Sequence, residues 1–192
     1  MVTDPLALFH DWLNNAQSRQ LAEPTAMALA TVDAVGQPAV RMVLLKHADE
    51  AGFVFYTNLE SDKGHQLIGS PFAELCFYWN PPGRQVRVHG PVEPVSAAEA
   101  DAYFASRAYK SKLGAWASQQ SRPLANQATL AKAVAKVALH HPLNVPRPPH
   151  WSGFRLVPQW IELWEEKPFR LHDRFRYERS ADGSWKSQRL FP

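Results

Sequence analysis

Met27-Ala-Leu-Ala-Thr-Val32 and Ala39-Val-Arg-Met-Val-Leu-Leu-Lys46 are two apolar runs joined by Asp33-Ala-Val-Gly-Gln-Pro38. Short runs rich in valine, leucine and threonine favour strands, and the Asp, Gly and Pro residues between them favour a tight turn. The stretch therefore predicts a β-hairpin over residues 27–46.

Further short strands are predicted along the chain. They cover Phe53–Thr57, Ala73–Trp79, Gln85–His89, Gln159–Glu165, Arg174–Arg179 and Trp185–Leu190. In the run 85–89, Val86 and Val88 face one way and the polar residues between them face the other, as in a half-buried strand. The intervals are too short for regular βαβ crossovers, so the pattern predicts an antiparallel barrel.

Helical patterns flank these strands. Asp4 can cap a helix over residues 4–19 with Pro5 in its first position. Ser61 can cap a short helix that carries Lys63 in its first turn. The apolar residues of the first helix recur with helical spacing: Leu6, Phe9, Leu13 and Ala16.

Two more helices follow. Ser96-Ala-Ala-Glu99 is a capping box that opens a helix from Ala97 to about Ala108. A later pattern places Leu130, Val134 and Val137 on one face and ends before Pro142. Together the patterns predict a single domain over residues 1–192, mainly β with flanking helices.

Composition narrows the class of protein. The chain has 192 residues, 45% of them hydrophobic, and 21 Lys plus Arg against 18 Asp plus Glu, a net charge of +3. This mild basicity suits phosphorylated small molecules better than nucleic acid. A lone cysteine, Cys76, forms no internal disulfide, and no export signal or membrane-length apolar run is visible, so a cytoplasmic protein is expected.

Three polar clusters are candidates for chemistry. The first joins Arg41 and Lys46 to Tyr56-Thr57 and to Ser61-Asp-Lys63. Two cations, two hydroxyls and a helix terminus can surround a phosphate. On residue types alone, ordinary solvated strand charges are favoured. Strict alternation puts Arg41 and Lys46 on opposite faces, so a shared site needs a bent strand or a site that wraps an edge.

The second cluster is Tyr103, Arg107 and Ser111, spaced by four residues. If the helix persists that far, the three form one polar stripe able to grip a second phosphate. An exposed helix face explains the same spacing equally well.

The third cluster is Arg170-Leu-His-Asp-Arg174. In an extended segment Arg170, His172 and Arg174 share a face, where an anion would neutralise them. A surface strand with interleaved charge is the alternative. His140-His141 has no matching ligand set, so no metal site is expected.

These clusters resemble the pyridoxamine 5′-phosphate oxidase family in order and spacing over nearly the whole chain. The resemblance is carried by Arg41–Lys46, Phe55-Tyr-Thr-Asn58, Arg84-Gln-Val-Arg-Val88, Tyr103-Phe-Ala-Ser-Arg107, Gly114-Ala-Trp-Ala-Ser118 and Arg170-Leu-His-Asp-Arg174. It implies an FMN-binding split β-barrel, antiparallel and Greek-key-like, that works as a homodimer with FMN between subunits. The helix 4–19 and the strands of 159–192 would complete the site.

The resemblance also implies residue roles. Contacts to FMN would come from Arg41, Met42, Val43, Leu44, Leu45, Lys46, Tyr56, Thr57, Lys63, Gln85, Gln120, Ser121, Trp164 and Arg174. The substrate phosphate would be bound by Lys46, Tyr103, Arg107 and Ser111. Arg170 and His172 would lie beside the pyridine ring as the catalytic pair, with positioning and electrostatic roles.

The implied reaction oxidises pyridoxamine or pyridoxine 5′-phosphate with O2 to pyridoxal 5′-phosphate and H2O2, with ammonia released from the amine. The flavin does the redox chemistry and the protein supplies alignment and charge. Two departures are expected to matter. Relatives often have an arginine where Asp62 stands, and many have a longer N-terminal segment over the active site.

Three other functions compete with this one. A flavin oxidase of the same fold, as in phenazine pathways, would not need the phosphate grip of Lys46, Tyr103, Arg107 and Ser111. A basic barrel that binds single-stranded nucleic acid would show an aromatic and basic stripe, which is not evident here. A non-catalytic barrel that stores pyridoxal phosphate would show no turnover.

Overall fold

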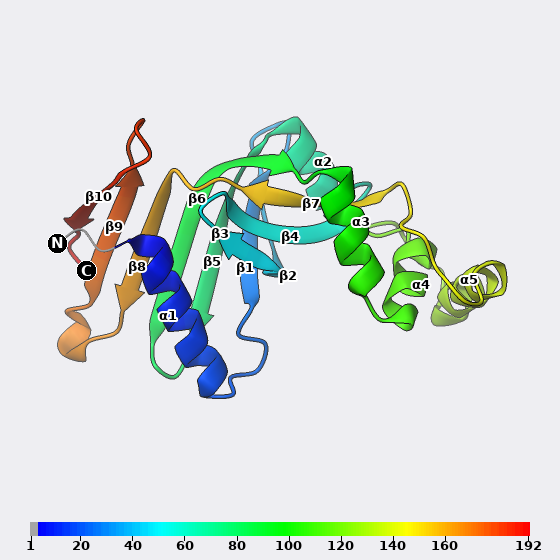
Figure 1. The fold of residues 1–192 in the computed structure, drawn as a ribbon, viewed down its shortest axis with the longest axis horizontal. Helices are drawn as coiled ribbons and strands as arrows, with labels where there is room; N and C mark the ends of the chain where they lie inside the picture. Colours follow the sequence, from blue (N-terminus) through cyan, green and yellow to red (C-terminus); the bar gives the residue numbers. More distant parts are fainter. Residues whose placement is uncertain (1–3) are drawn as a thin grey trace.

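One curled antiparallel sheet dominates the computed structural model, which describes residues 4–192 (Figure 1). Its strands are β1 (Ala26–Val32), β2 (Pro38–Leu44), β3 (His47–Asp49), β4 (Gly52–Asn58), β5 (Phe72–Trp79), β6 (Arg84–Pro94), β7 (Trp151–Leu156), β8 (Trp160–Glu165), β9 (Asp173–Arg179) and β10 (Trp185–Arg189). The helices are α1 (Pro5–Ser18), α2 (Asp62–Gly69), α3 (Ala97–Ser106), α4 (Tyr109–Ala117) and α5 (Gln127–His140), with a 3-10 turn at Pro168–Arg170. Helix α1 lies across the sheet. Helices α3, α4 and α5 lie together on the side of the molecule farthest from β10.

Strand β6 joins the two parts of the sheet. Its first part pairs with β5 on one side and β8 on the other, and Val92–Pro94 pair with β7. The path β10-β9-β8-β6-β5-β1-β2 forms one part, and β3, β4 and β7 form the other. Every pair is antiparallel. The predicted antiparallel barrel is therefore confirmed as a sheet that curls into a split barrel.

Gly90 lies where β6 passes from one part of the sheet to the other. A Cβ at this position would stand 2.0 Å from the carbonyl oxygen of Val157. The backbone NH of Val157 donates to Pro91, and that of Gln159 donates to His89. Glycine lets the two backbones approach closely enough for these bonds to form.

The predicted hairpin is confirmed. Strands β1 and β2 pair from Ala26 opposite Leu44 to Val32 opposite Pro38. The Asp33 carboxylate closes the turn by accepting from two backbone NH groups, those of Val35 and Gln37. Strand β2 ends at Leu44, earlier than predicted, because the chain bends there and Lys46 NH donates to the Val54 carbonyl of β4.

Two strands were not predicted, β3 and β7. Strand β7 reads Trp-Ser-Gly-Phe-Arg-Leu and follows a proline-rich connection, so neither its glycine nor its flanks favour a strand. Pairing with β4 along its whole length, from Asn58 opposite Trp151 onward, supplies the order that local propensity lacks.

The helix starts are predicted better than their ends. Asp4, Ser61 and Ser96 cap α1, α2 and α3 through their side chains, as expected. Helix α3 stops at Ser106, short of the predicted Ala108, because Arg107 has extended backbone angles.

In the described residues, no helix is long and apolar enough to cross a membrane. Residues 1–3 of the predicted domain lie outside the described part.

Helix α1 closes one side of the barrel with Phe9. This side chain is fully buried, and its ring meets Phe53 at 5.0 Å and Phe77 at 5.1 Å in edge-to-face contacts. Buried aromatic groups arranged in this way contribute both area and ring geometry. The core therefore depends on the packing of α1 against the sheet, because side-chain contacts and not strand pairing hold this helix in place.

Replacing Phe9 by alanine is expected to lower the free energy of unfolding by about 3–5 kcal/mol, because it leaves a cavity between α1 and the sheet. Urea unfolding followed by far-UV circular dichroism measures the change. The matched control is Leu139→Ala on α5, a side chain that is 82% exposed. Equal effects of the two substitutions would contradict this account of the core.

Candidate functional site

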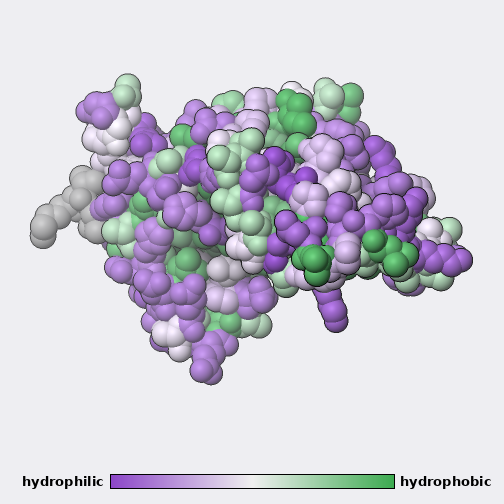
Figure 2. Space-filling view, turned by 45° about the vertical axis from the view of Figure 1, so that its right-hand side comes forward, coloured by the Kyte–Doolittle hydropathy of each residue, from purple (hydrophilic) through white to green (hydrophobic). Residues whose placement is uncertain are grey.

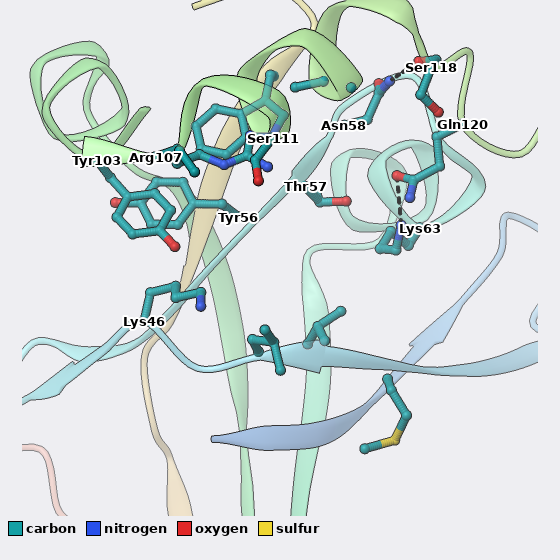
Figure 3. Close-up of a pocket in the computed structure, with 17 residues that line it drawn as sticks. Lys46, Tyr56, Thr57, Asn58, Lys63, Tyr103, Arg107, Ser111, Ser118 and Gln120 are labelled. Atoms are coloured by element: carbon teal, nitrogen blue, oxygen red, sulfur yellow. Dashed lines mark hydrogen bonds between the residues drawn. The ribbon is translucent and has the colours of Figure 1, made fainter. Parts of the chain in front are cut away.

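A cavity of about 710 Å³ opens between the β2 and β4 strands and the helices α2 and α4 (Figure 3). Eleven of the predicted site residues line it: Met42, Val43, Leu44, Lys46, Tyr56, Thr57, Lys63, Tyr103, Arg107, Ser111 and Gln120. The cavity has two polar ends. Lys46, Tyr103, Arg107 and Ser111 form one end, and Lys63 and Gln120 stand at the other.

The first end is assembled from three chain segments. Lys46 follows the bend after β2, Tyr103 lies on α3, and Ser111 lies in the first turn of α4. The predicted single helical stripe is wrong, because Arg107 is the extended residue that ends α3. The kink between α3 and α4 nevertheless brings Tyr103, Arg107 and Ser111 to the same wall of the cavity.

Arg107 carries the strongest sign of a missing partner. Its Nη1 is buried, and no acceptor in residues 4–192 pairs with it. The guanidinium lies over two rings, 4.9 Å from the centre of Trp151 and 5.5 Å from that of Phe104. Burial lowers the pKa of Arg107 from its ordinary value. A half-buried cation that lines a cavity and has one unpaired donor favours an anionic ligand.

Three aromatic rings form a stack beneath this end. Tyr56 lies 4.1 Å from Tyr103 and 5.2 Å from Trp151, with nearly parallel planes. Burial, aided by the charge of Glu99, raises the pKa of Tyr56 to about 12. The phenol therefore stays neutral at physiological pH and does not repel an anion in the cavity.

The second end lies at the start of α2. Lys63 Nζ donates to Gln120 Oε1 at 3.1 Å and to the Ser61 hydroxyl at 3.3 Å. Burial and then the nearby charge of Arg41 lower the pKa of Lys63. The first turn of a helix adds free backbone NH groups and a positive dipole end. This end also offers a site for a phosphate.

Ser121 and Asp62 meet beside Lys63. The backbone NH of Asp62 donates to the Ser121 hydroxyl at 3.3 Å. The Asp62 carboxylate is close enough to Lys63 to oppose the fall in its pKa. A carboxylate in the first turn of α2 therefore reduces the positive potential that a phosphate would meet there.

Arg41 is not among the residues that line the cavity. Its guanidinium donates to Thr31 Oγ1 at 2.5 Å, to Gln66 Oε1 at 2.9 Å and to the Leu29 carbonyl at 3.2 Å. Lys46 lines the cavity and Arg41 does not, but Lys46 lies beyond the end of β2, so strand alternation does not relate the two side chains. Leu45 is also outside the cavity, since its side chain is 5% exposed and belongs to the core.

The remaining predicted residues lie on the other part of the sheet. Gln85, Trp164 and Arg174 form one row across β6, β8 and β9. Arg174 donates through Nε and Nη2 to the buried carboxylate of Glu162, at 3.1 and 2.8 Å. This row does not line the cavity of its own chain.

The predicted extended segment from Arg170 to Arg174 is wrong in its first half. Phe169 and Arg170 have φ angles of 59° and 60°, inside the 3-10 turn. Two successive non-glycine residues in the left-handed region are strained. His172 packs on Trp164 with ring centres 4.6 Å apart, and strand β9 begins only at Asp173. Arg170 and His172 therefore also stand outside the cavity.

Sequence reasoning missed several lining residues. Asn58, Ser118 and Trp151 line the cavity although none was assigned a role, and Asn58 Nδ2 donates to the Ser118 carbonyl at 3.4 Å. No pattern in the sequence assigns Trp151 to the site. Its position after a proline-rich connection gave no hint that β7 would bring it beside Tyr56.

The fold and the two-ended cavity define a split-barrel protein. The solved structure of PhzG from Burkholderia lata 383, with tetrahydrophenazine-1-carboxylic acid, is 32% identical with a TM-score of 0.93, covering 98% of this chain and 93% of that one. An FMN-binding protein from Nostoc punctiforme PCC 73102, described as related to pyridoxamine 5′-phosphate oxidase, shares the fold at 20% identity and a TM-score of 0.82, covering 100% of this chain and 99% of that chain.

Two family models match the sequence itself. They are pyridoxamine 5′-phosphate oxidase over residues 13–141 and the pyridoxine 5′-phosphate oxidase C-terminal dimerisation region over residues 151–192. The chain belongs to the pyridoxamine 5′-phosphate oxidase family. A pyridoxine/pyridoxamine 5′-phosphate oxidase of Maricaulis maris is 59% identical, over 98% of this chain and 86% of the relative. One of Rhodospirillum rubrum is 56% identical, over 98% and 96%.

Gly153→Ala is expected to displace the ring of Tyr56. A Cβ at this position would stand 2.7 Å from Tyr56 Cδ1 and 2.9 Å from the Phe55 carbonyl oxygen. Overpacking of this kind destabilises by about 1–3 kcal/mol. Urea unfolding and near-UV circular dichroism of the aromatic stack measure the effect. Gly69→Ala is the control, since no atom lies within 4 Å of its added Cβ. Unchanged stability and an unchanged spectrum for Gly153→Ala would contradict the close approach.

Proposed function

We propose that this protein oxidises pyridoxamine or pyridoxine 5′-phosphate to pyridoxal 5′-phosphate with bound FMN and O2. The observation that carries the proposal is one cavity with two separate cationic ends. A flavin mononucleotide and a phosphorylated pyridine each bring one phosphate, so two ends match two ligands. The relatives named above at 56–59% identity support the same chemistry.

The residues present fit FMN. Lys63, Gln120 and the first turn of α2 would hold its phosphate, and the Thr57 hydroxyl lies on the same wall. Met42, Val43 and Leu44 offer an apolar edge for a flat ring system. Bound FMN would supply the redox chemistry, with O2 as the final electron acceptor. Asp62 would weaken the phosphate grip without removing it.

The other end would bind the substrate phosphate. Lys46 and Arg107 supply charge, and Tyr103 and Ser111 supply hydroxyl groups. The buried unpaired Nη1 of Arg107 fits a phosphate oxygen. The chain's part in the reaction is then to fix the substrate at the flavin edge and to exclude water from it.

A phenazine-type substrate is the second candidate. The likeness to PhzG supports it, since that structure holds tetrahydrophenazine-1-carboxylic acid. A carboxylate would also pair with Arg107. The full set of Lys46, Arg107, Tyr103 and Ser111 favours a phosphate, which carries more charge and more acceptor oxygens.

We further propose that a second copy of the chain completes the site. None of Gln85, Trp164, Arg170, His172 and Arg174 lines the cavity of its own chain, and the last four lie in residues 151–192, which match a dimerisation region. Exposed apolar side chains support contact between copies: Phe169 is 93% exposed, Leu171 67% and Met42 64%. The space-filling view shows such hydrophobic groups interspersed on a mostly hydrophilic surface (Figure 2).

The deciding experiment follows the visible absorbance of the FMN-loaded protein. Pyridoxine 5′-phosphate added without oxygen is expected to bleach the flavin. Air is then expected to restore the colour, with release of pyridoxal 5′-phosphate and H2O2. A protein that holds FMN but stays yellow would contradict the proposal, and bleaching by tetrahydrophenazine-1-carboxylic acid instead would favour the second candidate.

Arg107→Met is expected to raise KM for pyridoxine 5′-phosphate about 10- to 150-fold, because it removes a charged hydrogen-bond donor worth about 1.5–3 kcal/mol. Steady-state kinetics of peroxide release measures the change. The control is Arg19→Met, an exposed residue at the end of α1. An unchanged KM for Arg107→Met would show that the phosphate binds elsewhere.

Mixed dimers test whether two chains share a site. Arg107→Met and Arg170→Met proteins are unfolded and refolded together, and activity is assayed at a substrate concentration far below the raised KM, where each variant alone is expected to show little turnover. If one chain provides the cavity and its partner provides Arg170, half of the dimers are mixed and each has one intact site. About a quarter of the wild-type activity then returns. No recovery, with mixed dimers verified by mass spectrometry, would mean that both residues serve the site from the same chain.

A further inference from the structure

Trp151 occupies the centre of the aromatic group beneath Arg107. Only 6% of its surface is exposed. Its ring stacks on Tyr56 at 5.2 Å with an angle of 4° and meets the edge of Phe104 at 4.9 Å. The ring of Tyr103 is also nearly parallel to that of Trp151, with the ring centres 6.1 Å apart. The Trp151 ring thus contacts or lies parallel to the other aromatic rings at this end of the cavity.

Arg107 is held by ring faces and not by a carboxylate. Its Cζ lies 4.9 Å from the Trp151 centroid, within the range of a cation–π contact. A carboxylate partner would hold the guanidinium equally well, but it would occupy donors and cancel the charge. The ring faces attract the cation and leave its NH groups free, which agrees with the unpaired Nη1. The contact therefore fixes the cation without reducing its capacity to bind an anion.

Trp151 is itself fixed by the backbone. Its NH donates to the Pro148 carbonyl at 3.0 Å, and its carbonyl accepts from Arg147 Nη1 at 2.8 Å. Arg147 Nε also pairs with Asp101 at 2.6 Å, on the helix that carries Tyr103. The connection before β7 and helix α3 are thus joined around the ring. Trp151 cannot shift without disturbing the helix beside it.

We propose that Trp151 is the positioning residue that holds Arg107 ready for the substrate phosphate, and that it thereby determines the preference for phosphorylated over unphosphorylated pyridines. The inference rests on the proposed function, since it assigns the phosphate to this end of the cavity. Trp151 acts through Arg107, and needs no direct contact with the phosphate.

The test compares binding of pyridoxal 5′-phosphate with binding of pyridoxal, by equilibrium dialysis against the FMN-loaded protein. Trp151→Leu is expected to weaken binding of the phosphorylated ligand about 5- to 30-fold, the range of a desolvated cation–π contact. Binding of pyridoxal and of FMN should change less than about 2-fold. Trp151→Phe keeps a ring face and should recover most of the affinity. The control, Trp185→Leu, removes a ring that lies 5.8 Å from Arg179, outside the cavity.

A double-mutant cycle separates positioning from general damage. Trp151→Leu added to Arg107→Met should weaken pyridoxal 5′-phosphate binding no further, because the cation it positions is gone. Additive losses, or equal losses for pyridoxal, would overturn the inference. If the leucine variant does not fold by circular dichroism, the cycle is run with Trp151→Met, which fills more of the space and also lacks a ring face, and additivity there overturns the inference as well. A wild-type protein that binds both ligands equally would instead overturn the proposed function.

Discussion

Strand β6 can serve two parts of one sheet because residue 90 has no side chain. Each backbone NH and carbonyl group of a buried strand needs a partner, and β6 finds partners in β5, β8 and β7. Along β6 the pairing partner changes from β8 to β7. At this point a Cβ at residue 90 would clash with the Val157 carbonyl, so the change of partner requires glycine there. The curl of the sheet, and with it the separation of its two faces, depends on this close approach.

That separation explains how the site is distributed. The cavity is built where β4 and β7 turn away from the main sheet and meet α3 and α4, so it collects residues from the middle of the chain. The row from Gln85 to Arg174 stays on the main sheet, where Glu162, only 1% exposed, accepts from Arg174 and Arg176. The ion pairs with Glu162 fix the positions of both arginines on the main sheet, outside the cavity of the same chain.

Much of this arrangement could be predicted from the sequence. Alternation located most strands, and side-chain caps located the starts of three helices, because both signals are local. The kink after Ser106 and the strand at 151–156 depend on contacts with distant segments, which local patterns do not contain. The predicted grouping of Tyr103, Arg107 and Ser111 is correct, but the reason given for it is wrong. A kink between two helices brings the three side chains together, where one continuous helix was expected. Trp151 was missed because a tryptophan reads as core until its neighbours are known.

The strained turn at Phe169 and Arg170 brings two requirements into conflict, the stability of the backbone and the fixed positions of the side chains that it carries. Glycine adopts positive φ angles without penalty, so glycine in place of Phe169 would relieve the strain at that position. The same change would free the backbone that carries Arg170 and precedes His172, and positioning of those two side chains would be lost. A search for heat-resistant variants will therefore favour glycine at residue 169, although it loosens the segment that holds Arg170 and His172.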